Sequence, residues 1–478
     1  MTFNSVEFLI FYPIVVLLYF LLPRVFKWPM LLIASYIFYA YYSPSLSVLI
    51  FATTLVSWCA SMIIERSERL WVRRVCLLIT LTVCLGVLFF YKYFDFLSES
   101  MALLFGREPV LLNLMLPVGI SFYTFQTLSY VIDVYKKEVR TERNFFFYAL
   151  FVSFFPQLVA GPIERPSNLI PQLKETHKFS LENFKSGAKF MLLGFFKKIC
   201  VADLVAPYVN AVFNSADEAT SLGIIIATLL FALQIYCDFS GYTDIAIGSA
   251  RIMGIRLMKN FDHPYRAETV KEFWSRWHIS LSTWFRDYLY IPLGGNRCGR
   301  FRHLLNLFIV FLVSGLWHGA AFTFVIWGAL HGVYQIVGNL TYKKRNLLLS
   351  KVGLSEKSIS VRAVRRCVTF LLVSVGWIFF RANSLSDAMT LFSRLFSAHT
   401  PISDTLGALG LSTVNILLII SAALVLFILD NLVTYEENDG SQAVVSKGAF
   451  VYLIWVILTV WLLLFSKDMI STFIYFAF

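Results

Sequence analysis

Charged residues are scarce in this sequence. Asp, Glu, Lys and Arg make up 15% of the 478 residues, whereas hydrophobic residues make up 58% and aromatic residues 17%. Soluble globular domains usually contain about a quarter charged residues, so this composition excludes an ordinary soluble protein. It predicts an integral membrane protein with apolar helices that face lipid.

The sequence also lacks the cysteine spacing of a disulfide framework or a zinc site. Its seven cysteines show no paired spacing, and most lie in or beside apolar runs, so we expect no metal site. Internal repeats and low-complexity tracts are absent. A basic segment and a small-residue cleavage site are missing around the first apolar run, which is therefore expected to stay as the first helix.

Long apolar runs recur along the chain. Several approach the roughly 20 residues of a spanning helix. On that criterion we expect an all-α polytopic fold with about ten to twelve spanning and re-entrant helices. The clearest runs cover 6–22, 30–42, 75–91, 222–236, 306–316, 373–382, 411–432 and 450–465.

Basic residues give a net charge of +12, but they lie in short loops between the apolar runs. This pattern favours membrane topology over nucleic-acid binding. Basic clusters lie at 24–27, 66–74, 136–143 and 343–366, whereas 41–45 carries none. Cytoplasmic loops are enriched in Lys and Arg, so we predict that these clusters are cytoplasmic and the N-terminus extracytoplasmic.

One membrane domain is expected over residues 1–478. Within it we predict N-terminal spanning helices (1–144), a catalytic core (145–340) and C-terminal helices (341–478). The core begins with an apolar stretch, 145–160, that is too short for a comfortable span and is followed by a polar connector from Glu164 to Ser186. Broken helices at membrane depth are tolerated only where protein buries them or where they line a cavity, so the core is expected to surround a cavity.

Two histidines lie within the apolar core. His278 and His318 each follow a tryptophan and are 40 residues apart, which lets one helix leave a site and another return to it. Ionisable groups in membrane segments cost free energy unless they face a protein interior or water, and they mark functional sites by default. His331 lies 13 residues after His318 and would join the pair only if the helix breaks. Glycines that favour a kink or close packing there are Gly315, Gly319, Gly328 and Gly332.

Polar side chains also interrupt an apolar stretch at residues 234–248. Asp238 and Asp244 are about 240° apart around a helix, so one straight helix cannot direct both at one point. A break at Ser240-Gly241 would allow it.

Acyl transfer is the chemistry that the histidines suit. A neutral imidazole can take a proton from an alcohol and return it to a leaving thiolate, and we assign this role to His318. His278 is the candidate for orienting the acyl carbonyl or holding the developing oxyanion. A single membrane histidine more often hydrogen-bonds a neighbour, but two in Trp-His contexts favour a site.

Several motifs together resemble the membrane-bound O-acyltransferase (MBOAT) family, and within it the bacterial alginate O-acetyltransferase branch. The resemblance covers about residues 1–381. Its motifs are Arg-Trp-His-Ile-Ser-Leu-Ser-Thr-Trp (276–284), Arg-Asp-Tyr (286–288), Gly-Gly-Asn-Arg (294–297), Leu-Trp-His-Gly-Ala (316–320), Trp-Gly-Ala-Leu-His-Gly (327–332), Pro-Val-Gly-Ile-Ser-Phe-Tyr (117–123), Ala-Gly-Pro-Ile (160–163) and Asp-Phe-Ser-Gly-Tyr (238–242).

The resemblance implies a helix bundle around a central funnel or tunnel, with the family's essential histidine at His318 and a second site position at His278. It implies acetyl transfer from a cytoplasmic donor, acetyl-CoA, to an extracytoplasmic polysaccharide such as alginate, through an extracytoplasmic acetyltransferase partner. The protein would be a multi-pass protein of the bacterial cytoplasmic (inner) membrane, surrounded by membrane lipids.

Other residues have two interpretations. Arg276, Arg286 and Arg297 could bind the donor's phosphates, but an interfacial helix anchored at the headgroups is favoured. Asp287 is expected to be structurally paired, and 294–297 to form a turn. Residues expected to line the cavity or to bond neighbouring helices are Asp238, Ser240, Tyr242, Asp244, Trp317 and His331.

Alternative functions remain open at this point. The same motifs would suit a subunit for O-acetylation of peptidoglycan or cellulose, whereas D-alanyl transfer to teichoic acid fits the motifs less well. A transporter or flippase also uses broken helices and midplane polar groups, but its inverted repeats are not found. The histidine could act as a base or as a nucleophile.

Overall fold

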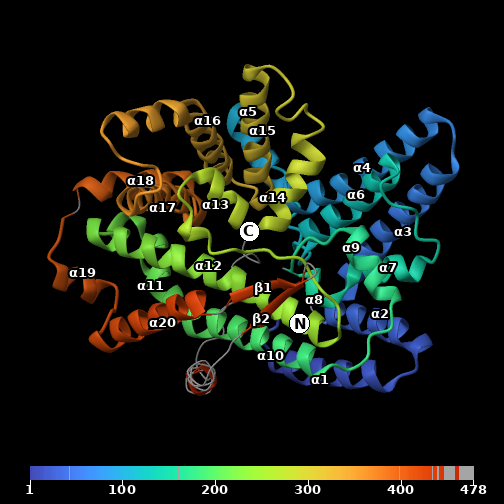
Figure 1. Ribbon diagram of the computed structural model, residues 1–478. Coiled ribbons are helices and arrows are strands. Elements are labelled where there is room, and N and C mark those ends of the chain that lie inside the picture. The colour runs from blue at the N-terminus through green and yellow to red at the C-terminus, as the bar shows by residue number, and fades with distance from the viewer. Residues whose placement is uncertain are drawn as a thin grey trace. The chain divides into compact units, whose positions relative to one another are not determined.

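Most of the residues that the structure describes lie in helices, as the sequence predicts (Figure 1). This computed structural model describes residues 1–41, 44–159, 161–397, 399–432, 434–438, 441–445 and 458–461. All but one of the predicted apolar runs coincide with helices; the run at 450–465 lies almost wholly outside the described residues. A short sheet of two strands, β1 (Thr434–Asn438) and β2 (Ser441–Val445), is added to the helices.

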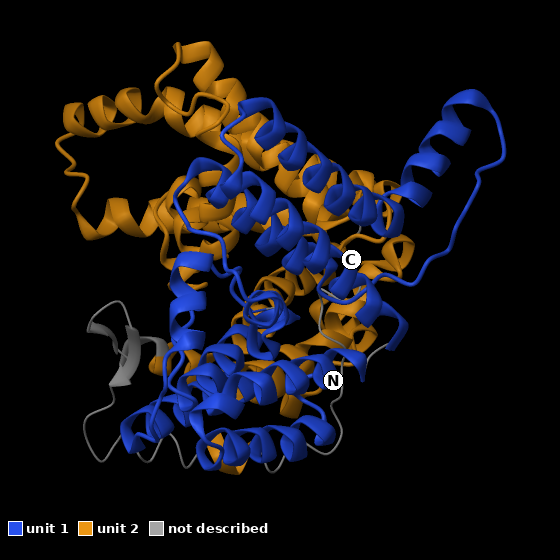
Figure 2. Cartoon of the chain, turned by 90° about the vertical axis from the view of Figure 1, so that its right-hand side faces the viewer, with its two compact units in different colours: residues 1–195, 242–258, 435–445 blue, residues 196–241, 259–434, 446–478 orange. Residues whose placement is uncertain are grey.

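The chain forms two compact units (Figure 2). The first comprises residues 1–195, 242–258 and 435–445, and the second comprises residues 196–241, 259–434 and 446–478. The long helix α12 (Ser221–Ile252) contributes to both units. The expected division at residues 144 and 340 follows composition rather than contacts and stays a prediction.

The first unit contains the N-terminal helices. They are α1 (Val6–Leu21), α2 (Arg24–Ala40), α3 (Pro44–Arg66), α4 (Leu70–Lys92), α5 (Phe94–Phe105), α6 (Ile120–Lys136), α7 (Phe145–Ser153), α8 (Phe155–Leu158), α9 (Pro166–Lys174) and α10 (Leu181–Phe195). The apolar stretch at 145–160 is broken as predicted, into α7 and α8, with Pro156 at the start of α8. The polar connector is partly helical, because α9 buries Leu169, Ile170 and Leu173 on one face.

The second unit contains the predicted histidines. Its elements after the π-helical turn η1 (Phe196–Ala202) are α11 (Asp203–Phe213), η2 (Ala216–Glu218), the first part of α12, η3 (Pro264–Arg266), α13 (Val270–Arg276), α14 (Ile279–Phe285), the π-helical η4 (Arg286–Tyr290), α15 (Arg300–His318), α16 (Phe322–Lys351), α17 (Ile359–Arg381), α18 (Leu385–Ser397), α19 (Ile402–Ala408) and α20 (Thr413–Leu432).

Five of the described helices are long and apolar enough to cross a membrane, namely α3, α4, α12, α15 and α17. Helix α19 and the first part of α20 meet the same test together, although they are bent by 84°. The shorter α1 exposes a row of apolar side chains, among them Val6 (68% exposed), Ile10 (61%) and Leu17 (59%). Soluble proteins rarely expose such large apolar patches, so these surfaces face lipid and the chain is a multi-pass membrane protein.

Helices α15 and α16 form a tight helical hairpin. A Cβ atom on Gly315 would lie 2.3 Å from the carbonyl oxygen of Phe324, and one on Gly328 would lie 2.4 Å from that of Phe311. Small residues let helix backbones approach this closely. The close packing predicted from the glycines is thus confirmed, and the hairpin carries His318 at its tip.

Candidate active site

His318 is the last residue of α15 and lies almost completely buried, at 3% exposure. The helix ends there because Gly319 is extended, and α16 begins only at Phe322. Three aromatic rings surround the imidazole: those of Trp317 and Trp327, each with its centroid 5.0 Å away, and that of Phe380 at 5.4 Å. His318 is therefore enclosed by aromatic side chains, surroundings that suit a neutral imidazole.

His331 lies on α16 and shares one aromatic neighbour with His318. The helix breaks between these two histidines, and both rings contact Trp327, at 4.9 Å for His331 and 5.0 Å for His318. Trp274 Nε1 of α13 donates a hydrogen bond of 3.1 Å to His331 Nδ1. This bond connects α13 to α16, which supports a structural role for His331.

His278 immediately precedes α14 and is fully buried. Its backbone is left-handed, with φ of 44°, a conformation that is uncommon for residues other than glycine. Its Nδ1 lies 3.0 Å from Oδ1 of Asn260, and Phe239 of α12 meets the imidazole edge-on at 4.6 Å. The ring is thus held both by packing and by a hydrogen bond.

His278 and His318 share one aromatic neighbour, Trp317. The Trp317 ring lies 6.0 Å from the ring of His278 and 5.0 Å from that of its neighbour His318. All three residues are buried and belong to the second unit. Helix α15 and the segment before α14 therefore bring both imidazoles to one aromatic cluster.

Asp238 belongs to a buried cluster of charges in the second unit. Lys198 Nζ lies 2.7 Å from Asp238 Oδ1 and 2.9 Å from Asp203 Oδ1. The three side chains are each at most 3% exposed. Phe239, which contacts His278, follows Asp238 directly in α12, so this cluster anchors a helix that forms one wall of the histidine site.

The conditional break at Ser240-Gly241 does not occur. Helix α12 runs without interruption from Ser221 to Ile252, so Asp238 and Asp244 point in different directions and belong to different units. Ser240 is buried in the second unit, whereas Tyr242 stacks on Phe3 in the first, with centroids 4.4 Å apart. A single mid-helix glycine costs only about 1 kcal/mol relative to alanine, which packing outweighs.

Comparison with known proteins identifies the family in which the two histidine motifs occur. The model of the family described as MBOAT, membrane-bound O-acyltransferase family, matches residues 77–375, which include both histidine motifs. The chain belongs to this family. It is accordingly an acyltransferase, and a transporter or flippase has no observation in its favour.

Three relatives of this acyltransferase differ in how similar they are to it and in how much of the chain they match. The probable alginate O-acetylase AlgI of Pseudomonas putida is 40% identical over 404 residues, which cover 83% of this chain and 80% of the relative. The peptidoglycan O-acetyltransferase of Helicobacter pylori is 35% identical over 426 residues, or 81% and 78% of the two chains. The teichoic acid D-alanyltransferase of Bacillus subtilis is 27% identical over 242 residues, or 48% and 61%.

The three predicted arginines of the acyltransferase do not form a cluster with the histidines in the described contacts. Arg276 pairs with Glu272 one turn earlier at 2.8 Å, and Arg286 pairs with Asp287 at 2.7 Å, as expected for Asp287. Arg297 is exposed in the predicted turn, where Gly294 and Gly295 have positive φ. Binding of donor phosphates by these arginines stays a prediction.

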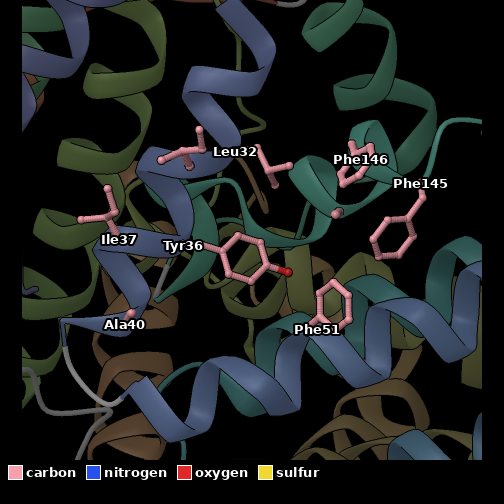
Figure 3. A pocket seen from close by; sticks show the side chains of 9 residues that line it. Leu32, Tyr36, Ile37, Ala40, Phe51, Phe145 and Phe146 are labelled. Atoms are coloured by element: carbon pink, nitrogen blue, oxygen red, sulfur yellow. The ribbon is translucent and has the colours of Figure 1, made fainter.

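An apolar groove of about 470 Å³ lies in the first unit, between α2, α3 and α7 (Figure 3). The side chain of Tyr36 points toward Phe51 within it. None of the predicted site residues of the acyltransferase lines this groove. Its lining residues are Leu32, Ile33, Tyr36, Ile37, Ala40, Phe51, Phe145, Phe146 and Ala149.

Sequence reasoning missed Lys198, Asp203 and Asn260. A signal existed for the lysine, because Lys197 and Lys198 interrupt an apolar stretch and the rule that marked the histidines applies to them equally. No local pattern distinguishes Asn260, which becomes notable only through its hydrogen bonds to residues 18 and 20 positions later.

Proposed function

We propose that this acyltransferase moves acetyl groups from acetyl-CoA on the cytoplasmic side to a polysaccharide outside the cytoplasmic membrane. The single observation that carries the proposal is the convergence of two buried histidines on Trp317 in a chain whose relatives include O-acetylases. An extracytoplasmic acetyltransferase partner would complete the transfer. The inner-membrane location and the extracytoplasmic N-terminus belong to the same proposal.

In the proposed mechanism, His318 acts as the general base. Its imidazole takes the proton of the acceptor hydroxyl as the hydroxyl oxygen forms a C–O bond with the acetyl carbon. The C–S bond of the thioester breaks, and the thiolate receives the proton from the imidazole. The aromatic rings around His318 support this role, since a site that excludes water keeps the imidazole neutral and limits hydrolysis of the thioester.

Alginate or a related exopolysaccharide is the first candidate acceptor, because the alginate-type relatives are 38–40% identical. Peptidoglycan is the second candidate, supported by the 35% identity to the Helicobacter pylori peptidoglycan O-acetyltransferase. Cellulose has no such relative among those described here. Mass analysis of acetyl esters on secreted polysaccharide and on peptidoglycan, with and without the gene, would identify the polymer.

The role of His318 is tested by its replacement with alanine. Acetyl esters on the polymer should fall at least about 100-fold, the lower range for loss of a general base, at an unchanged protein level in the membrane. His303→Ala is the matched control, since His303 lies in the first turn of the same helix and contacts Tyr290 instead. Retained acetylation in His318→Ala would refute the assignment.

A further inference from the structure

One oxygen atom, Oδ1 of Asn260, holds the segment that carries His278. It lies 3.0 Å from His278 Nδ1 and accepts hydrogen bonds from the backbone amide of Ser280 at 3.2 Å and from Ser280 Oγ at 2.9 Å. The backbone carbonyl of Asn260 accepts a further bond of 2.9 Å from the amide of Ile279. Asn260, His278 and Ser280 are each 0% exposed.

These contacts determine which ring nitrogen of His278 carries the proton. A backbone amide can only donate, so the Asn260 atom that faces the Ser280 amide is the side-chain oxygen and not the nitrogen. Ser280 Oγ also lies 3.5 Å from His278 Nδ1, but its single proton is directed to Asn260 Oδ1 at the shorter distance of 2.9 Å. An amide oxygen can only accept, so at 3.0 Å from Oδ1 His278 Nδ1 is the donor. The neutral imidazole therefore has its proton on Nδ1 and its lone pair on Nε2.

We propose that Asn260 is a positioning residue that makes His278 a hydrogen-bond acceptor in the acyltransferase site. Neutral His278 then cannot donate from Nε2 to a developing oxyanion, which is the role that its motif first suggests. Instead, Nε2 orients a substrate by accepting a hydrogen bond from its N–H or O–H group. The inference rests on the proposed function and specifies what one of its two histidines does.

The tautomer can be measured without any activity assay. In ¹⁵N-histidine solid-state NMR of the full chain in lipid, with His278→Gln used to assign the signal, His278 should show a protonated Nδ1 and an unprotonated Nε2. Asn260→Ala should abolish this preference. A protonated Nε2 on neutral His278 in the unmodified chain would overturn the proposal, whatever the activity.

The functional part uses membranes supplied with radiolabelled acetyl-CoA, with label in polysaccharide measured from pH 5.5 to 8.5. Asn260→Ala should lower kcat by about 10–100-fold, the loss seen when the outer partners of metal-bound histidines are removed. Asn260→Asp keeps the acceptor and adds a negative charge, which favours the imidazolium. It should restore most of the plateau activity while moving the acidic limb of the pH profile to higher pH.

The direction in which Asn260→Asp moves the acidic limb of the pH profile distinguishes an acceptor role of His278 from a donor role. If His278 acted as an N–H donor, Asn260→Asp would leave activity unchanged or improve it at low pH, and this result would refute the acceptor role. An increase in KM for acetyl-CoA in Asn260→Ala would identify an amide of the donor as the group held, whereas an increase in KM for the acetyl acceptor would identify the acceptor hydroxyl. Both support the proposal, and unchanged kcat and KM would contradict it.

Two controls separate this role from general destabilisation. Asn306 is also fully buried, and its side-chain amide donates to the carbonyls of Leu293 and Gly295. Asn306→Ala should lower thermal stability but leave the pH profile and the His278 tautomer unchanged. Absence of label transfer by unmodified membranes from cells that acetylate the polysaccharide would refute the proposed function, while the NMR result would still decide the tautomer.

Discussion

Buried polar side chains at the candidate site are held by partners from other elements of the fold. Trp274 donates to His331, and Lys198 bridges Asp203 and Asp238. A buried charge costs free energy unless it is paired and hydrogen-bonded. These contacts therefore restrict where α12, α13 and α16 can lie, and they give the histidines fixed surroundings.

Lys198→Met tests the charge cluster. The substitution leaves two carboxylates facing one another without the shared cation, and breaking a buried ion pair costs about 3–5 kcal/mol. We expect a clear decrease in the thermal unfolding temperature of the purified protein in detergent. Lys185→Met on the exposed face of α10 should change it little, and equal stability of the two variants would show that the cluster contributes nothing.

Glu164 introduces a pH dependence of stability in the first unit. Burial raises the pKa of its carboxyl from 4.5 to about 7, although Asn168 and the Met258 amide both donate to it. The folded state thus holds this proton more tightly than the unfolded state. The contribution of Glu164 to stability is fully present below about pH 4.5 and is lost as the pH rises through about 7, a loss of on the order of 3 kcal/mol.

Glu164→Gln should remove this dependence, because Gln does not ionise. Relative to the unmodified protein, the variant should become progressively more stable between pH 5 and pH 7.5, as measured by thermal unfolding at each pH. Glu175→Gln is the control, because Glu175 is exposed nearby in the chain. A difference in unfolding temperature that stays constant across this range would contradict the prediction.

At the scale of elements, the α15–α16 hairpin is the part of the fold that positions His318. Its two glycines allow backbone contact, and its tip is short because α15 ends at His318 and α16 begins at Phe322. The sequence predicted close packing or a kink from these glycines. It did not predict which helices would meet, since that depends on side chains from α13 and α17 as well.

Gly315→Ala should separate the two helices. The added methyl group would lie 2.3 Å from a backbone oxygen that cannot move independently, and such overpacking typically costs about 1–3 kcal/mol. We expect lower thermal stability and lower acetyl transfer, because His318 lies one turn away. Gly338→Ala on α16 is the matched control, as nothing lies within 4 Å of its added methyl; similar behaviour of both variants would refute the packing argument.

At the scale of the whole molecule, the apolar surface and the basic loops together indicate a protein that spans a membrane several times. Exposed apolar side chains on helices such as α1, α3 and α4 have no favourable place in water. The basic loops predict the orientation of the chain in that membrane.

Cysteine labelling from either side tests this topology. In a chain whose seven native cysteines are replaced, Ser355→Cys in the basic loop before α17 should react with a membrane-impermeant maleimide only in inside-out vesicles. Ser45→Cys, at the exposed start of α3 beside the segment 41–45 that carries no basic residue, should react only in right-side-out vesicles. The opposite pattern would reverse the predicted orientation of the N-terminus.

The sequence by itself determined the membrane class, the helical architecture, the broken stretch at 145–160 and the family, because these follow from local composition and short motifs. It also singled out His278 and His318, since ionisable groups are rare in apolar segments. Only the tertiary structure decided that α12 is unbroken, that Lys198 holds Asp238 and that Asn260 holds His278. Such contacts join residues 18 to 40 positions apart, and no local pattern specifies which distant groups will satisfy a buried polar atom.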